Sequence, residues 1–209
     1  LKVIFNGVDI EAYEQKEHGK VSKTDLKIPA GAFVVGMVGR ISPQKAPDVF
    51  IKAAKLIKQE IPDAYFIIVG GGEMENEIKQ YAKENELKNC LHITGWVDDP
   101  LDYVELFDVA CLLSRWEGFG LVLPEYMMVG KPIVATQVDA PNIISNYQNG
   151  ILVKVDDEVA VSRAVIEIQK NPMLKNKLVQ QGQKDVRLRF DAKRVSYEHE
   201  ILFRKLVEQ

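Results

Sequence analysis

The feature that most constrains this fold is the regular alternation of short apolar runs with segments of helical periodicity. Runs of four to eight apolar residues that end at glycine or proline are typical of strands buried on both faces. Their alternation with helices predicts an α/β fold: a single Rossmann-like, doubly wound domain of about six parallel strands, with helices on both faces and further helices at the C-terminus. The runs lie at residues 33–41, 65–69, 91–96, 109–113, 132–136 and 151–153.

Weaker patterns predict the remaining elements. Residues 1–5 are apolar and precede the turn pair Asn6-Gly7, which indicates another short strand. Residues 9–30 are polar and are expected to form an irregular exposed connection. Helical spacing of apolar residues, or the place of a segment between strands, predicts helices over 47–61, 74–86, 101–107, 121–129 and 141–146, and a terminal helix over 192–207 whose inner side carries Val195, Tyr197, Ile201, Leu202 and Leu206.

Candidate site residues follow the predicted strands. In open parallel sheets, ligands bind outside the carboxyl ends of the strands. The residues that fall at those ends, and that we expect to line one rim, are Gly39-Arg40, Gly70–Gly72, Gly95-Trp96, Ser114–Gly120 and Thr136.

The stretch from Ser114 to Thr136 indicates an anion site. A strand there runs into a glycine-rich turn that opens a helix, whose first N–H groups and dipole favour a negative ligand. Glu117 lies in the turn and Glu125 in the helix; they form either a general acid and base pair or two acceptors for sugar hydroxyls. Arg40 and Lys45 follow the first sheet strand and are suited to neutralising a diphosphate.

Composition excludes several classes of function. The 209 residues carry a formal charge of −3 and a pI near 5.7, which argues against nucleic-acid binding. Cys90 and Cys111 cannot form a disulfide framework and favour a reducing, cytoplasmic location. The three histidines are scattered, so no metal site is expected. No apolar run is long enough for a membrane span, and a start at Leu1 suggests a piece of a longer protein.

Two common nucleotide motifs are not matched. Gly70-Gly71-Gly72 is followed by Glu75 where a dinucleotide fingerprint needs a third glycine, and no P-loop pattern occurs. Gly118-Phe119-Gly120 has no serine between its glycines and is not a nucleophile elbow.

Several motifs in order carry a resemblance to a known family. Glu117 and Glu125, seven residues apart within Glu-Gly-Phe-Gly-Leu-Val-Leu-Pro-Glu and followed by Gly130-Lys131-Pro132, are similar to the donor-site signature of the GT-B glycosyltransferases of family 4. Three further stretches also resemble elements of that family and extend the match over nearly the whole chain: Ile4–Asp9, Gly39-Arg40 with Lys45, and Gly95-Trp96-Val97.

The resemblance implies a role for each matched residue. Arg40 and Lys45 would hold the donor diphosphate, Glu125 the ribose hydroxyls and Glu117 the hydroxyls of the transferred sugar. Backbone near Val97 would recognise the base. Glu117, Arg40 and Lys45 would be the catalytic residues, and the donor site would be completed by Gly39, Gly118, Phe119, Gly120 and Leu121.

Three departures from the family pattern are visible. Ala46 replaces the glycine after the lysine, and Gly71 replaces a frequent acid; both changes are expected to affect only backbone. Ala140-Pro141-Asn142 stands where the family usually has two glycines and then a glutamate, which bears on the sugar-side loop.

The resemblance also implies an activity. Residues 1–209 would be the nucleotide-sugar donor domain of a two-domain enzyme that transfers a sugar with retention to a glycan, lipid-linked or small-molecule acceptor, without metal or other cofactor. Residues 1–30 would be the lead-in linker, and residues 188–209 would reach toward a missing N-terminal domain that binds the acceptor, at the inner membrane face. Alone, the chain is expected to bind donor without turnover and to self-associate. The alternatives are a sugar-nucleotide epimerase of GT-B build and a non-catalytic nucleotide-binding or interaction domain.

Overall fold

A six-stranded sheet lies at the centre of the molecule in the computed structural model, which describes residues 3–138 and 143–207. Every strand pairing in the sheet is parallel, which confirms the predicted α/β fold. In sheet order the strands are β3 (Leu91–Ile93), β2 (Ala64–Val69), β1 (Phe33–Val38), β4 (Val109–Leu112), β5 (Ile133–Thr136) and β6 (Ile151–Val153).

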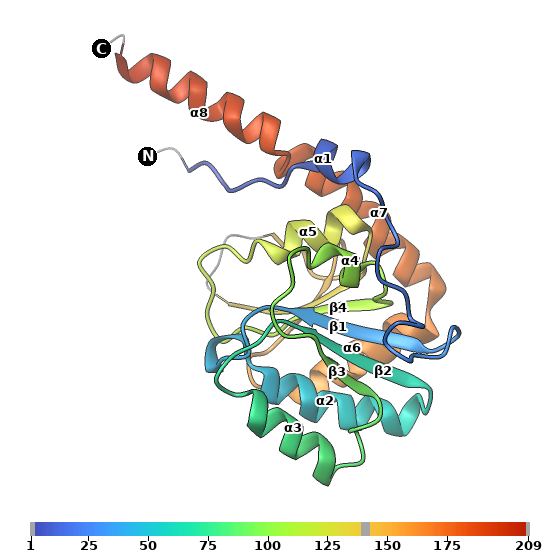
Figure 1. The fold of residues 1–209 in the computed structure, drawn as a ribbon. Helices are drawn as coiled ribbons and strands as arrows, with labels where there is room; N and C mark the ends of the chain where they lie inside the picture. Colours follow the sequence, from blue (N-terminus) through green and yellow to red (C-terminus); the bar gives the residue numbers. More distant parts are fainter. Residues whose placement is uncertain (1–2, 139–142, 208–209) are drawn as a thin grey trace.

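Helices cover both faces of this sheet (Figure 1). One face packs against α2 (Pro47–Glu60), α3 (Glu75–Glu84) and α6 (Glu158–Lys170). The other packs against α4 (Leu101–Val104) and α5 (Val122–Val129), with residues of α1 (Ile10–Gln15) in the same core. The long helix α7 (Pro172–Arg189) contributes Leu178 to the first core and Val186 to the second.

The alternation of side chains along β1 shows why the strands are apolar throughout. Val35 and Met37 enter the core under α2, whereas Val34 and Val38 enter the core under α5. Successive strand residues point to opposite faces, so a strand covered on both sides needs apolar residues at every position. Each fully buried aliphatic side chain contributes about 1.5–3 kcal/mol to folding.

The strand order reverses its direction of growth between β1 and β4. At such a switch point the connections after the two strands leave toward opposite faces, and a crevice opens outside their carboxyl ends. The phenol of Tyr126, fully buried on α5, accepts a hydrogen bond from the Val38 amide at 2.8 Å and donates to the Cys111 carbonyl at 3.4 Å. One side chain thereby attaches α5 to both strands that flank the crevice.

The predicted strand over residues 1–5 is wrong where the structure describes it, since residues 3–5 are extended without strand pairing. Apolar character has another cause here: the Phe5 ring packs against Phe119 and Phe190. The prediction that residues 9–30 are irregular missed α1. Asp9 caps this helix by accepting from the Ala12 amide at 2.9 Å, so a short helix forms in a polar segment.

Two further predictions need correction. Of the helix expected over 141–146, residues 139–142 lie outside the described part and residues 143–146 are not helical. The side chain of Asn149 stabilises a turn here instead. Its Nδ2 donates to the Ile143 carbonyl at 3.1 Å, and its Oδ1 accepts from the Ser145 backbone amide at 2.7 Å. The strand expected over 91–96 ends at Ile93, because Gly95, with φ of +69°, leaves the parallel pairing with β2 and forms only an isolated antiparallel bridge with Gly70.

The terminal helix α8 (Ala192–Val207) projects away from the sheet at the top of Figure 1. None of its described residues is buried, although its apolar residues recur at helical spacing. Tyr197 and Leu206, expected on an inner side, are 63% and 59% exposed, because α8 leaves the body of the fold after Phe190.

We expect Gly36→Ala to destabilise the fold strongly. A Cβ at Gly36, in the middle of β1, would lie 2.2 Å from the Phe107 ring, and overpacking of this kind costs about 1–3 kcal/mol. Chemical denaturation measures the loss, and Gly31→Ala is the control because a Cβ there meets no atom within 4 Å. Equal midpoints for the two variants would contradict the packing described here.

Candidate functional site

The loops that leave the sheet at the switch point bring Lys45 and Glu117 together. Lys45 ends a 3-10 turn (Pro43–Lys45) after β1, and Glu117 lies in the turn after β4. The Lys45 ammonium forms a salt bridge with Glu117 Oε1, and Ser114 Oγ donates to the same oxygen at 2.8 Å. Both side chains are largely enclosed, with exposures of 18% for Lys45 and 9% for Glu117. The predicted convergence of these two loops on one rim is confirmed.

Close backbone contact explains two glycines at this rim. A Cβ on Gly70 would stand 2.2 Å from the Gly39 carbonyl oxygen, and Gly70 has φ of +135°. A Cβ on Gly72 would stand 2.5 Å from the Ile41 carbonyl oxygen. Glycine at both positions lets the loop after β2 lie directly against the loop after β1.

Ala46 occupies a left-handed position that glycine would favour. It has φ of +51°, is fully buried and immediately precedes α2. An alanine in this conformation costs about 1–2 kcal/mol relative to an ordinary helical conformation.

The N-terminus of α5 points its first amides into the same region. Gly120 has φ of +79°, and α5 begins two residues later without a side-chain cap. The N–H groups of Gly120, Leu121 and Val122 donate no hydrogen bond to any residue in the described part of the chain. Pro124 lies in the first turn, where a missing N–H removes no helical bond. Free amides at a helix N-terminus favour an anionic ligand.

Glu125 lies on the first turn of α5 and forms no salt bridge with any residue in the ranges 3–138 and 143–207. Burial and the nearby Asp99 carboxylate raise its pKa to about 7. The ion pair that Asp99 makes with Lys16 at 2.8 Å contributes to holding the pKa of Asp99 below its usual value, despite the opposing effect of burial. Asp99 therefore stays ionised near neutral pH, while Glu125 is divided between its two forms.

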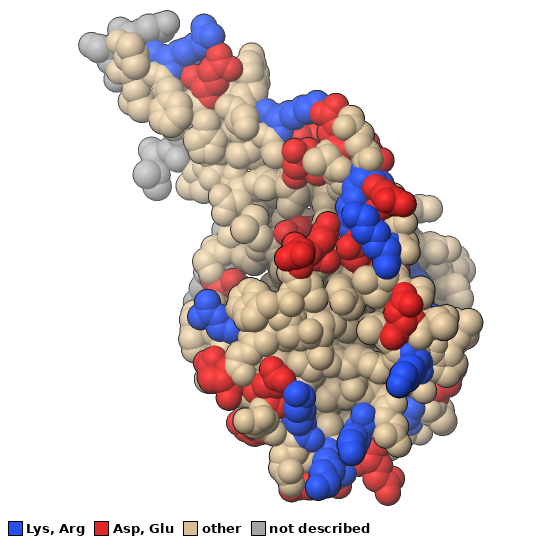
Figure 2. Space-filling view, in the orientation of Figure 1, with Lys and Arg blue, Asp and Glu red and all other residues tan. Residues whose placement is uncertain are grey.

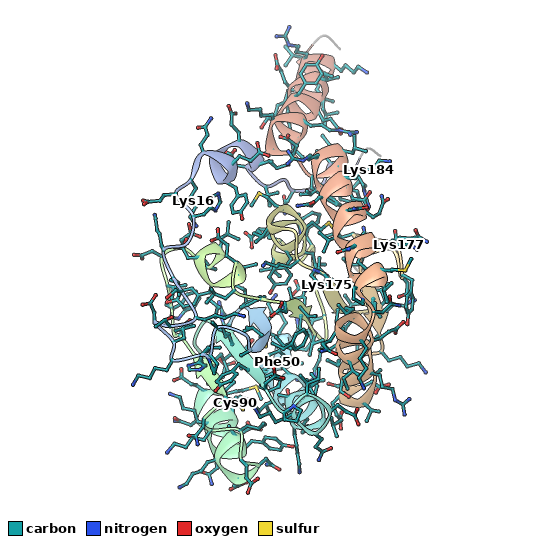
Figure 3. The ribbon with its side chains drawn as sticks, turned by 90° about the vertical axis from the view of Figure 1, so that its right-hand side faces the viewer. Lys16, Phe50, Cys90, Lys175, Lys177 and Lys184 are labelled. Carbon is teal, nitrogen blue, oxygen red and sulfur yellow. The ribbon has the colours of Figure 1, made fainter. Side chains whose placement is uncertain are left out.

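Residues 16–18 are attached close to Asp99 by ion pairs. Lys16, labelled in Figure 3, also pairs with Asp102 at 2.5 Å, and His18 Nδ1 lies 2.5 Å from Glu105. Acidic side chains gather near α4 on the face drawn in Figure 2. These contacts hold residues 16–18 against α4 and next to the loop that carries Asp99.

The other predicted site residues lie around this centre. Arg40 and Gly118 are exposed, and Arg40 makes no salt bridge within residues 3–138 and 143–207. Val97 is partly buried after β3, beside Trp96, which is 78% exposed. Leu121 is 47% exposed, whereas the Phe119 ring packs with Phe5 and Phe190, so it offers a ligand its backbone rather than its ring.

Three residues shape the site although the sequence predicted no individual role for them. Ser114 holds Glu117, and Arg115 and Gln44 connect the loops after β4 and β1. Ser114 and Arg115 lie in the stretch Ser114–Gly120, which was expected to line the rim, whereas Gln44 does not. Neither Arg115 nor Gln44 indicated a specific role, since an arginine and a glutamine in surface turns are ordinary. Within the described residues, no three histidine, cysteine or acidic side chains are placed to hold a metal ion.

Comparison with known proteins places the chain in a family. Residues 20–185 match the model of the family described as glycosyl transferases group 1. The chain is 34% identical over 179 residues to the Escherichia coli UDP-Gal:alpha-D-GlcNAc-diphosphoundecaprenol alpha-1,3-galactosyltransferase, an alignment that covers 83% of this chain and 46% of the relative. It is 28% identical to the lipopolysaccharide core biosynthesis glycosyltransferase LpsD of Rhizobium meliloti (strain 1021), with 84% and 50% covered.

Solved structures agree with this placement. The crystal structure of Anabaena Alr3699/HepE in complex with UDP-glucose has a TM-score of 0.87 and 25% identity, with 98% of this chain and 57% of that chain covered. The C-terminal domain of the group 1 protein LpcC from Francisella tularensis has a TM-score of 0.78 and 26% identity, with 88% and 99% covered. The chain spans about half the length of the curated relatives it matches. It belongs to the glycosyl transferases group 1 family and has the fold of a C-terminal GT-B domain.

Proposed function

We propose that this chain binds a nucleoside-diphosphate sugar as the donor half of a glycosyltransferase. The observation that carries the proposal is the meeting of Lys45, Glu117 and the start of α5 at the switch point of the sheet, where the first amides of the helix donate to no described residue. The amides and Lys45 suit a diphosphate, and the two acids Glu117 and Glu125 suit hydroxyl groups on either side of it. Uridine donors come first in any test, because the Anabaena relative was crystallised with UDP-glucose.

Charge development supports a role in transfer as well as in binding. When the bond from the sugar to the diphosphate breaks, negative charge grows on the departing phosphate oxygens. Lys45, Arg40 and the amides at Gly120 and Leu121 would interact more strongly with this charge in the transition state than with the bound donor in the ground state. Lys45 is paired with Glu117 in the structure, so donor binding would move the ammonium from the carboxylate to the diphosphate and free Glu117 for the sugar.

The finer assignments follow the family resemblance. We place the enzyme among the retaining transferases of family 4, working without a metal ion and with base recognition by backbone near Val97. The positions Ala140, Pro141 and Asn142, which bear on the sugar-side loop, lie outside the described residues.

The acceptor site belongs to the half of the enzyme not represented in this chain. A first domain would face the crevice, supply the acceptor site and complete catalysis, so this chain alone would bind donor without turnover. The E. coli relative is named for a diphosphoundecaprenol acceptor, which supports action at the inner membrane face from the cytoplasm. No helix within residues 3–138 and 143–207 is long and apolar enough to cross a membrane.

The alternatives separate by experiment. An epimerase of GT-B build would convert a nucleotide sugar without an acceptor, whereas a non-catalytic module would bind nucleotide and never transfer in any longer form of the protein. The spacing of Glu117 and Glu125 favours the transferase over both.

We expect calorimetric titration with UDP, GDP and ADP sugars to find one donor that binds. Lys45→Ala and Glu125→Ala should each weaken the affinity for this donor about ten- to a hundredfold. Each substitution removes a hydrogen bond that involves a charged group, and such a bond is worth about 1.5–3 kcal/mol. Lys177→Ala is the control, since Lys177 is exposed on α7 (Figure 3). Failure of every donor to bind, or undiminished binding in both variants, would refute the proposal.

The raised pKa of Glu125 makes donor binding and stability depend on pH. If the ionised form binds the ribose, a pKa of about 7 predicts about tenfold tighter binding at pH 8 than at pH 6. Nucleotide sugars have no phosphate group that titrates in this range, so the change reports the protein. Glu125→Gln should bind more weakly and without this dependence.

Stability should change in the opposite direction. The folded pKa lies above the value of 4.5 expected for an unfolded glutamate, so the folded state disfavours ionisation and loses stability as pH rises from about 4.5 through 7. The total loss of unfolding free energy over this range is on the order of 3 kcal/mol. Thermal unfolding of Glu125→Gln at pH 8 should show a gain over the parent that disappears at pH 4; an equal gain at both values would contradict the assignment.

We also propose that α8 covers a surface of the missing first domain. With that surface absent, Phe203, at 60% exposure, and Leu206, at 59%, remain open to solvent, so the chain should self-associate at high concentration. Sedimentation measures this. Phe203→Ser with Leu206→Ser should shift the chain toward monomer, and a clean monomer of the unaltered chain would overturn the expectation.

A further inference from the structure

The guanidinium of Arg115 joins three loops at the rim of the sheet. Arg115 follows β4, and its Nη1 donates to the Pro43 carbonyl at 2.6 Å in the loop after β1. Its Nη2 donates to Asp48 Oδ2 at 2.8 Å in the first turn of α2. Its Nε donates to Asp156 Oδ1 at 2.8 Å in the turn after β6. The guanidinium holds these three acceptors in directions fixed by its plane, whereas the three donors of an ammonium radiate from one nitrogen and rotate freely.

Backbone bonds reinforce the same junction from the other side. The Arg115 amide donates to the Gln44 carbonyl at 2.8 Å, and Gln44 Nε2 donates to the Trp116 carbonyl at 3.0 Å. Gln44 immediately precedes Lys45, and Trp116 immediately precedes Glu117. The two loops that carry the proposed phosphate and sugar residues are therefore connected by four hydrogen bonds to or from residues 43, 44 and 48.

Arg115 is not placed to contact the donor itself. Each of its three guanidinium nitrogens already donates to an oxygen of the protein, and the side chain is 24% exposed. Its partners are carbonyls and carboxylates of loops and of one first helical turn. A residue so engaged acts on the site through the loops it holds.

We infer that Arg115 is a positioning residue that sets the place of Lys45 relative to Glu117, an inference that rests on the proposed function. Residues that hold a reacting group in place without touching the substrate have large effects, because a displacement of about 1 Å can reduce rate about a hundredfold. Without the Arg115 side chain, the loop from Pro43 to Lys45 keeps its sequence and charge but loses the bonds to Pro43 and Asp48. Only the two bonds at Gln44 then remain of the four that join it to the Glu117 turn.

The primary test is a double-mutant cycle on donor binding by this chain. In the parent chain, Arg115→Ala should weaken the binding of the nucleotide sugar about tenfold. In the Lys45→Ala background the same substitution should weaken binding less than about twofold, because Arg115 acts by positioning Lys45. Arg115→Lys should not restore binding, since it keeps the charge and loses the fork. Restoration by lysine would mean that charge alone matters, and equal effects in both backgrounds would mean that Arg115 does not act through Lys45; either result overturns the inference.

A second measurement tests the junction without any ligand. Amide hydrogen exchange in Arg115→Ala should rise about tenfold or more in residues 40–48 and 114–120 and stay unchanged in the sheet. Arg187→Ala is the matched control, since it removes an exposed ion pair between Arg187 on α7 and Glu14 on α1. Exchange rates that are unaltered, or raised uniformly through the chain, would overturn the inference that Arg115 holds these loops together.

The two experiments separate the inference from the proposed function. If the parent chain binds no nucleotide sugar, the proposed function fails and the role of Arg115 toward a donor fails with it, while local exchange still shows whether the loops are joined. If the parent binds but the cycle is additive, the proposed function stands and the positioning role is refuted.

Discussion

The single direction of all six strands is the constraint on which the rest of the structure depends. Parallel strands bring all their carboxyl ends to one edge, and the reversal of order between β1 and β4 opens that edge at one point. Lys45 and Glu117 are 72 residues apart in sequence, yet the switch point makes them neighbours. Tyr126 then attaches α5 to both flanking strands, which brings the helix N-terminus to the same place.

The site is organised at some cost to the fold. Glu125 is partly buried without a cation, Ala46 takes a left-handed conformation, and amides at the start of α5 lack acceptors among the described residues. Each feature is unfavourable for folding, and the proposed donor, with its phosphates and hydroxyls, would relieve or use it. Lys45 and Glu117 differ, because they neutralise each other in the structure and would exchange partners on binding.

Local sequence predicted those parts of the fold that depend on local physics. Continuous apolar runs such as residues 109–113 identified the buried strands, and Gly130, a left-handed cap with φ of +75°, ended α5 as expected. Prediction failed where a contact distant in sequence decides. Phe5 is apolar because it meets Phe119 and Phe190, so a strand was assigned to a segment without a strand neighbour. The short helix α1 depends on one capping aspartate in a polar stretch that otherwise resembles a loop.

By itself, the sequence determined the fold class, the rim on which the site residues lie and the identity of its main charges, because strand periodicity and glycine turns are local properties. Only the tertiary structure decided which charges meet. The raised pKa of Glu125 depends on burial and on Asp99 from another loop, and the junction at Arg115 depends on three segments brought together by strand order. Electrostatic and hydrogen-bond partners are set by distance in space, and that distance exists only after the sheet has assembled.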